Sequence, residues 1–438
     1  MRSTRFIIRF LTAFIFRFKW IIILSLIIGI SLFFVIRFLL PSIEGSRTEK
    51  IGVVGRYPNT ESLPKNILEM VSTGLTRVND KGEVEPAVAE SWTTTDSGKT
   101  WIFKLKNNIY WQDGKLLTSD SLIYDFSDAK FKVIDKNTVS FTLQSPFSPF
   151  PVIVSKPIFK KGLLGVGNWK VSKATLAGGY IQQLVLISKN NEKKIYKFYP
   201  TEERAKLAYK LGQIDNIQNI YDPNPLQNWE SIKIITEVNQ NNFVAIFFNT
   251  SDPLLSNKTV RQALAYAIDK SSFDGPRAVS PISPTSWAFN PQVKQYSFDT
   301  ERAKELLKDI PQNSISLKIS TIPMLLPVAE KIVTNWKAVG INASVQVYTT
   351  IPQETQVLLA IFQIPQDPDQ YALWHSTQEN TNISHYKSPR IDKLLEDGRV
   401  ELNLEARKKI YLDFQRFLIE DSPAIFLYHP ITYTISRK

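Results

Sequence analysis

An uncharged apolar run divides the chain into two unequal parts. From Trp20 to Ile36 the sequence holds no charged residue, and residues 38–40 continue the apolar stretch beyond Arg37. A run of this length is about what an α-helix needs to cross the hydrocarbon core of a bilayer. We therefore expect residues 20–40 to form a transmembrane anchor, with the long remainder of the chain folding on one side of the membrane.

Basic residues precede this run, at Arg2, Arg5, Arg9, Arg17 and Lys19. The positive-inside tendency then keeps residues 1–19 in the cytoplasm and exports the chain from a linker at residues 41–50 onward. The expected location is the plasma membrane, single-pass, with the bulk of the chain extracytoplasmic. A cleaved signal peptide is the alternative, but the run is long and no clear A-x-A-like site follows it.

The charge and the cysteine content narrow the possible partners. Half of the net charge of +12 lies in residues 1–50, which hold eight Lys/Arg and two Glu. The rest shows no basic face interleaved with stacking aromatics, so we do not expect nucleic-acid binding. The chain has no cysteine, which excludes disulfides and a lipid carried on a thiol. The apolar helix is therefore the expected tether to the membrane.

Length and local pattern indicate two α/β lobes. A chain of 438 residues exceeds what one hydrophobic core normally organises. Thr201 should cap a helix with Glu202 and Glu203 in its first turn and Gly212 at its end. Strand-like segments rich in β-branched or aromatic residues lie at residues 51–54, 101–105, 138–143 and 244–248.

A βαβ unit is predicted later in the chain. Residues 315–320 read as a strand, residues 327–339 as a helix with a proline near its first position, and residues 341–348 alternate apolar and polar positions. Parallel strands with crossover helices predict an α/β architecture.

The segment from Val84 to Tyr124 combines a strand with alternating apolar residues at 101–105, a tight turn at Asp113-Gly114, and a helix start at Thr118 or Ser119. The order of these pieces resembles the extracellular solute-binding proteins of ABC importers, in the family that binds peptides and nickel complexes (family 5). Similar matches follow at residues 165–171, 201–215, 249–270, 299–307 and 367–369, so that the resemblance covers about residues 51–430.

This resemblance implies a two-lobed fold of the periplasmic-binding-protein type (type II, peptide-binding class). Lobe I would comprise residues 51–244, completed by 425–438, and lobe II residues 245–424, with crossing strands near 240–250 and 423–428. The chain is shorter than typical members between Asp120 and Lys132 and between Pro157 and Gly165. We therefore expect the small accessory domain of peptide binders to be reduced or missing.

A second departure concerns how a ligand is held. In peptide-binding members, a carboxylate three residues before the Asp-Pro-Asp segment pairs with the α-ammonium group of the ligand. Ile364 stands at that position here. The ion pair that defines a free peptide N-terminus is therefore expected to be absent.

Candidate ligand-binding residues surround this segment. Asp367 and Asp369 could receive a cationic group, although Asp-Pro-Asp is also ordinary turn chemistry. Trp374 could stack on a ligand beside His375, or be core packing beside a surface imidazole. We expect Trp374→Ala to weaken ligand binding without unfolding the lobe.

Three aromatic residues outside this segment are further candidates. Trp287 lies in a proline-punctuated loop that runs near the cleft in family members, although it could equally be structural packing. Tyr57 follows the first strand, and Trp111 precedes the Asp-Gly turn; both are weaker candidates.

Enzymatic chemistry finds little support in the sequence. His375, His385 and His429 form no HExxH motif or close helical pair, and there is no G-x-S-x-G elbow and no complete dinucleotide fingerprint. Nucleophiles assembled from distant positions stay open. We expect no enzyme, no cofactor and no metal site in the protein itself.

The expected function is a monomeric receptor that captures an oligopeptide-like ligand, or another small solute, between two lobes by hinge closure and delivers it to an ABC permease. The alternative is a membrane-anchored sensor or envelope interaction module on the same fold, with no transport role. A third reading, the binding of a metal complex or haem, requires the histidines to gather around the cleft.

Overall fold

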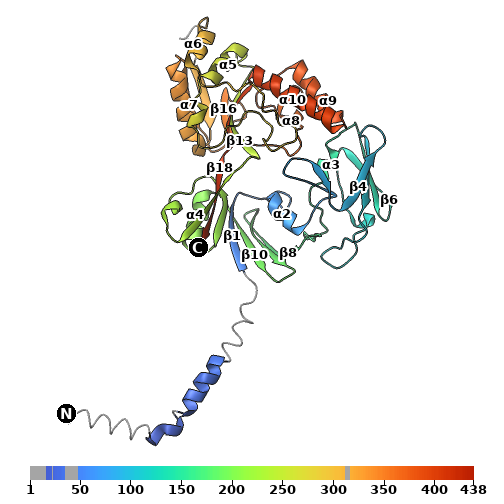
Figure 1. Cartoon of the computed structure of the whole chain (residues 1–438), viewed down its shortest axis with the longest axis vertical. Coiled ribbons are helices and arrows are strands. Elements are labelled where there is room, and N and C mark those ends of the chain that lie inside the picture. The colour runs from blue at the N-terminus through green and yellow to red at the C-terminus, as the bar shows by residue number, and fades with distance from the viewer. Residues whose placement is uncertain (1–15, 22, 35–47, 311–315) are drawn as a thin grey trace, which may run out of the picture.

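The computed structural model describes residues 16–21, 23–34, 48–310 and 316–438. An apolar helix, Phe16–Phe34, has a mean hydropathy of 2.0 over its most apolar 18 residues. None of these residues is buried against the rest of the protein. Figure 1 shows it apart from the folded body. In length and composition this helix can cross a bilayer. The predicted cytoplasmic residues 1–15, the end of the predicted span (35–40) and the linker up to residue 47 lie outside the described residues.

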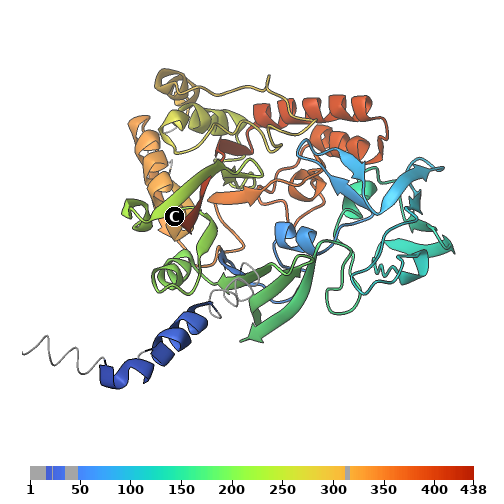
Figure 2. The ribbon, with the colours of Figure 1, turned by 60° about the horizontal axis from the view of Figure 1, so that its bottom comes forward.

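The folded body is built on three main β-sheets (Figures 1 and 2). Lobe I contains a seven-stranded sheet with the order β12-β18-β11-β1-β10-β9-β8, and lobe II a five-stranded sheet with the order β15-β14-β16-β13-β17. A four-stranded antiparallel sheet, β4-β5-β7-β6, forms an accessory unit, and β2 pairs with β3. The strands are β1 (Thr48–Val54), β2 (Thr76–Val78), β3 (Val84–Pro86), β4 (Ala89–Thr94), β5 (Thr100–Leu105), β6 (Ala129–Asp135), β7 (Thr138–Leu143), β8 (Trp169–Ala177), β9 (Tyr180–Ser188), β10 (Lys193–Tyr199), β11 (Asn216–Ile220), β12 (Ile232–Val238), β13 (Asn242–Phe248), β14 (Ser316–Thr321), β15 (Asn342–Val347), β16 (Val357–Gln363), β17 (Ala424–Tyr428) and β18 (Ile431–Arg437).

Helices cover the faces of these sheets. They are α2 (Lys65–Val71), α3 (Phe150–Ile153), α4 (Glu202–Lys210), α5 (Lys258–Tyr266), α6 (Thr300–Leu307), α7 (Leu326–Ala338), α8 (Tyr371–Trp374), α9 (Pro389–Val400) and α10 (Leu404–Asp421). In lobe I, α2 packs Ile67 and Val71 into a core with Ile51 of β1, whereas α4 packs Tyr209 into a second core with Ile217 of β11. The centre of the lobe I sheet is therefore covered on both faces, as expected for an α/β lobe.

Two local expectations from the sequence are confirmed. The hydroxyl of Thr201 accepts a hydrogen bond from the backbone N–H of Arg204 and caps α4. The βαβ unit is also present, because β14 and β15 are parallel neighbours and α7 lies between them in the chain. Trp336 of α7 is buried, and its Nε1–H donates to the backbone carbonyl of Leu264, 3.1 Å away.

The chain passes between lobe I and lobe II twice. Residues 239–241 connect β12 to β13, and residues 429–430 connect β17 to β18. The backbone N–H of Asn239 donates to the carbonyl of Pro430, 2.9 Å away, so that the two crossing segments are joined. The expected boundaries at 244/245 and 424/425 are therefore wrong by a few residues. Both β13 and β17 belong to lobe II, because they pair with each other.

The strand directions follow from these crossings. β18 leaves the crossing, β11 runs antiparallel to it, and β1 and β10 continue in the direction of β11. In lobe II, β13 leaves the crossing, β16 returns antiparallel to it, and β14 and β15 run parallel to β16. The carboxyl ends of both sets of strands therefore point toward the opposite lobe (Figure 1).

The accessory unit is present, with a core of its own. Trp101, Phe103 and Phe141 are buried in it, together with Phe150 of α3. Of the two alternatives expected for this domain, reduced or missing, the structure therefore excludes the second. The helix expected to start at Thr118 or Ser119 does start at Ser119, but it is only one 3₁₀ turn, Ser119–Ser121, and the backbone is extended at Leu122.

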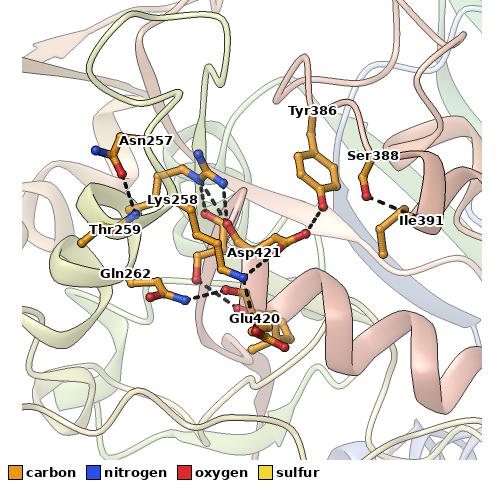
Figure 3. Close-up of polar contacts among 12 residues, drawn as sticks. Asn257, Lys258, Thr259, Gln262, Tyr386, Ser388, Ile391, Glu420 and Asp421 are labelled. Atoms are coloured by element: carbon orange, nitrogen blue, oxygen red, sulfur yellow. Dashed lines mark hydrogen bonds and ion pairs between the residues drawn. The ribbon is translucent and has the colours of Figure 1, made fainter.

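The segment 249–270, which carries much of the family resemblance, is a structural joint in lobe II. Lys258 contacts Glu420 and Asp421 at the end of α10, and the Tyr386 hydroxyl donates to Asp421, 2.6 Å away (Figure 3). Arg261 is 4% exposed. Its guanidinium donates to four backbone carbonyls, those of Leu255, Ser256, Asp421 and Ser422.

We predict that Arg261→Gln lowers the free energy of unfolding by about 3–5 kcal/mol, because several buried carbonyl oxygens lose charged donors. The matched control is Arg416→Gln, since Arg416 forms an exposed ion pair with Asp413 one helical turn away. That change should cost less than about 0.5 kcal/mol. Urea unfolding followed by tryptophan fluorescence measures both. An equal loss of unfolding free energy in the two variants would contradict a structural role for Arg261 in this joint.

A second prediction concerns His429 in a crossing segment. Its Nδ1–H donates to the carbonyl of Asn242, 2.8 Å away, and burial lowers the pKa of His429 below its ordinary value. The unfolded chain therefore takes up a proton at a higher pH than the folded chain does. The resulting contribution to stability is complete above the unfolded pKa of about 6.5 and is lost as the pH falls from there toward the folded pKa.

His429→Gln should therefore make the free energy of unfolding fall less steeply between about pH 7.5 and pH 5.5 than in the parent. The control is His385→Gln, because His385 lies beside Glu354 and away from the crossing segments. Urea midpoints measured across this pH range test the prediction. Curves of identical slope for the parent and His429→Gln would refute it.

Candidate functional site

The two facing carboxyl edges define the candidate site. On lobe I the edge is formed by the residues that follow β1 and β10 and by the β8–β9 turn, and on lobe II by the residues that follow β14 and β16. In α/β sheets, ligands bind outside the carboxyl ends of parallel strands. These two edges, joined by the crossing segments, are therefore the place to test the expected residues.

Tyr57 lies at the lobe I edge. Gly55 turns the chain at φ +145°, and an added Cβ there would meet the Tyr57 ring. The backbone N–H of Gly55 donates to Tyr199, and the carbonyl of Tyr57 accepts from Ile181, which draws this segment across the end of β10. The Tyr57 ring packs edge-on against Phe198, with its centroid 5.0 Å away, and burial raises its pKa.

A pocket of about 300 Å³ opens at the same edge. It lies between the segment after β1, the β8–β9 hairpin and the end of β10. The Arg56 guanidinium lies over the Tyr180 ring, 5.8 Å from its centroid. Neither residue was singled out from the sequence. Arg56 carried a usable signal, because it is a charged residue two positions after a predicted strand. Tyr180 comes close to it only through the pairing of β9 with β10 and of β10 with β1.

The two aspartates at the lobe II edge are already paired. Asp367 is 8% exposed and receives two hydrogen bonds from Arg407, at 2.6 and 2.8 Å. Asp369 accepts from Arg399 at 3.0 Å, and its own backbone N–H donates to the Asp367 carboxylate, as in an Asx turn. Burial raises the pKa of Asp369 although Arg399 opposes this. A cationic ligand group would have to displace one of these arginines.

Ile364 occupies the lobe II edge as a buried apolar side chain. It is 6% exposed, and its backbone N–H donates to the carbonyl of Asn241 in a crossing segment, 2.7 Å away. This bond fixes the end of β16 against the crossing. The side chain offers no charge to a ligand ammonium group.

Trp374 and His375 are held inside lobe II. Trp374 is fully buried and its ring stacks on Phe247 of β13, with centroids 6.0 Å apart. The indole N–H has no hydrogen-bond partner among the described residues. His375 stacks on Tyr371, and its Nε2 lies 3.3 Å from Glu396. The imidazole is therefore buried rather than at the surface, and the indole wall expected at the cleft is core packing in this structure.

Trp287 lies where lobe I and the accessory unit meet lobe II. Its backbone N–H donates to the carbonyl of Lys81, 2.9 Å away, and the ring packs edge-on against Tyr411. Near this contact, Lys65 of α2 donates to the side-chain carbonyl of Gln366, 2.5 Å away. These bonds join parts of the molecule on opposite sides of the cleft.

Arg399 makes a second contact of this kind. Its guanidinium lies over the rings of Tyr371 and Phe147, 4.2 and 4.9 Å from their centroids. Its backbone carbonyl accepts from the N–H of Ser148 at 2.6 Å. The accessory unit thus rests on lobe II through a stacked arginine.

Trp111 is part of the accessory core, and its Nε1–H donates to Ser121, 3.0 Å away. The neighbouring Gln112 ties the accessory unit to lobe I, because its amide donates to the carbonyls of Val71, Gly167 and Trp169. The Trp-Gln-Asp-Gly turn is therefore a joint between the two units.

The structure thus gathers four of the seven expected residues, Asp367, Asp369, Trp374 and His375, on the segment after β16. Tyr57, Trp287 and Trp111 lie at three other places. A direct contact with ligand stays a prediction for each of them. Within the described residues, no group of three or more His, Asp or Glu side chains is placed to hold a metal ion.

The burial of Trp374 changes the expected effect of its removal. Trp374→Ala should leave a cavity and lower the free energy of unfolding by about 3–5 kcal/mol, rather than act on ligand binding alone. Trp229→Ala is the control, because Trp229 is 38% exposed. Urea unfolding of both variants tests this prediction. An unchanged midpoint for Trp374→Ala would instead favour the interpretation that Trp374 stacks on a ligand.

Comparisons with known proteins agree with this geometry. The dipeptide-binding protein of Escherichia coli (strain K12) is 23% identical over 444 residues, which cover 81% of this chain and 83% of that protein. NikZ from Campylobacter jejuni, solved in complex with Ni(L-His), superposes with a TM-score of 0.74 at 23% identity over 89% of this chain and 94% of that one. The oligopeptide-binding protein AppA from Bacillus subtilis, solved with a nonapeptide, gives a TM-score of 0.70 at 21% identity over 90% and 95%.

The family model for bacterial extracellular solute-binding proteins, family 5 (middle region), matches residues 83–130 and 187–382, more than half of the chain. The matched residues include the accessory strand β5, the crossing at 239–241 and the segment after β16. This protein belongs to the bacterial extracellular solute-binding proteins of family 5.

Proposed function

We propose that this protein is the substrate-binding receptor of an ABC importer, and that it captures an oligopeptide-like ligand in the cleft between lobe I and lobe II. The observation that carries the proposal is the pair of facing carboxyl edges joined by two short crossing segments. A peptide as ligand is supported by the dipeptide-binding relative and by the neighbour solved with a nonapeptide.

Hinge closure is the proposed mechanism. Two crossing segments let the lobes rotate about one axis, and a ligand that binds both edges favours the closed arrangement. The bonds from Lys65 to Gln366 and from Trp287 to Lys81 are of the kind that such a movement makes and breaks. The closed receptor would then dock on the permease.

The ligand would be held chiefly through its backbone. Ile364 supplies no carboxylate for an ammonium group, and Asp367 and Asp369 are already bound by Arg407 and Arg399. Hydrogen bonds to peptide groups, several through water, would then carry affinity without demanding one side chain. The receptor would bind its ligand without converting it.

The apolar helix Phe16–Phe34 is proposed to be an uncleaved anchor, with the basic N-terminus in the cytoplasm and the lobes outside. Such a tether raises the concentration of the receptor near its permease. We further propose that the anchored receptor acts as a monomer.

The test uses the full-length protein in detergent, first by native mass spectrometry for co-purified ligands and then with defined peptide pools. A bound peptide at a hundred times its Kd should stabilise the folded state by about 2.7 kcal/mol. Solution scattering should show a more compact particle. N-acetylated and free peptides should bind alike, within about threefold, because Ile364 offers no ion pair.

The possible outcomes separate the alternatives. One defined non-peptide species would retain the receptor and replace the ligand class. No stabilisation and an unchanged scattering profile with every pool would overturn the import proposal in favour of an anchored sensor or interaction module. A strong preference for free N-termini would show that an ammonium site exists elsewhere in the cleft.

A further inference from the structure

The arginines at the two edges differ in whether they have a carboxylate partner. At the lobe II edge, each aspartate has its own arginine, Arg407 for Asp367 and Arg399 for Asp369. At the lobe I edge, Arg56 is exposed and makes no ion pair or hydrogen bond with any residue in the described part of the chain. The Arg56 guanidinium is therefore a cation that no described carboxylate pairs with.

The surroundings of Arg56 form a binding site of definite chemistry. The pocket beneath it measures about 300 Å³, at the lower end of the range for small-ligand sites. Its other described lining residues are uncharged, and they are Gly55, Ala177, Gly178, Tyr180, Ile181, Gln182, Phe198 and Pro200. One guanidinium against mostly apolar walls favours a ligand with a single anionic group on an apolar body.

The backbone on both sides of Arg56 is fixed. The N–H of Gly55 donates to Tyr199 at 2.7 Å, and the carbonyl of Tyr57 accepts from Ile181 at 2.8 Å. The Tyr180 ring then supports the guanidinium from one side. A planar guanidinium held in this way can donate two parallel hydrogen bonds to a carboxylate.

From these observations we infer that Arg56 and its pocket bind a carboxylate of the ligand, so that the cleft selects ligands by an anionic group. The inference rests on the proposed function and narrows its ligand class. Because Ile364 supplies no carboxylate and the aspartates are paired, the ligand is oriented by its negative end. On a peptide that group is either the terminal α-carboxylate or an acidic side chain.

The experiment measures peptide affinities by calorimetry on the full-length protein in detergent. Three peptides of one sequence are compared: one with a free C-terminus, one with a C-terminal amide, and one amide with an internal Gln replaced by Glu. The variants are Arg56→Gln and Arg56→Lys. The control is Lys189→Gln, which removes one positive charge from the β9–β10 turn at the opposite edge of the sheet.

The expected result is a loss of about tenfold or more in the affinity of Arg56→Gln for a carboxylate-bearing peptide. Arg56→Lys should be intermediate and Lys189→Gln unchanged. The amide without Glu should bind the parent more weakly and lose nothing further in Arg56→Gln. If Arg56→Gln loses affinity only for the peptide with a free C-terminus, the bound group is the α-carboxylate. If it loses affinity only for the Glu-containing amide, the bound group is the acidic side chain.

Two results would overturn the inference, and they are distinct. If Arg56→Gln binds every peptide as the parent does, the anion site is wrong while peptide capture stands. If the parent binds none of the peptides, the proposed peptide ligand fails and the inference fails with it. Circular dichroism spectra that match between parent and variants keep an affinity loss from being read as misfolding.

Discussion

The double crossing between the lobes is the constraint on which the rest of the molecule depends. Because the chain leaves lobe I after β12 and returns into β18, the direction of every strand next to the crossing is set. The bond between Asn239 and Pro430 holds the two crossing segments together as one connection. Two sheets with parallel strands then have to present their carboxyl ends to each other. The cleft is a result of this topology, and side chains only decide what it accepts.

Buried arginines build the frame of lobe II. Arg261 donates hydrogen bonds to backbone carbonyls of two segments that are distant in the sequence. Arg407 forms an ion pair with Asp367, which follows β16. In both places a delocalised cation is matched by several acceptors, which makes burial of the charge tolerable. The motifs that identify the family thus include joints of the scaffold. The family match covers such joints, whereas the proposed anion site at Arg56 lies outside the matched residues.

Local periodicity predicted the local structure well. β1, β5, β13, α4 and the βαβ unit were all readable from apolar spacing and capping residues. The sheet to which each strand belongs could not be predicted in this way. The sequence of β17 fits either lobe, and only its pairing with β13 places it in lobe II. Whether Trp374 packs in the core or faces a ligand stayed open for the same reason, since its burial depends on Phe247, far away in the sequence. The surroundings of a side chain depend on such distant pairings, so the sequence predicted the local elements better than the contacts of single side chains.

The accessory unit is attached to its two neighbours in different ways. Toward lobe I, the amide of Gln112 and the close approach of Gly165 and Gly167 to the backbone of residue 71 make a joint of short, directional bonds. Toward lobe II, Arg399 stacks on Phe147, and Ser148 donates hydrogen bonds to the backbone carbonyls of Arg399 and Gly398, so that one stacked ring and one residue make the contact. When the lobes part, the molecule should divide along the stacked surface. The accessory unit and lobe I would then move together as one rigid body. A ligand would enter on the side of Phe147.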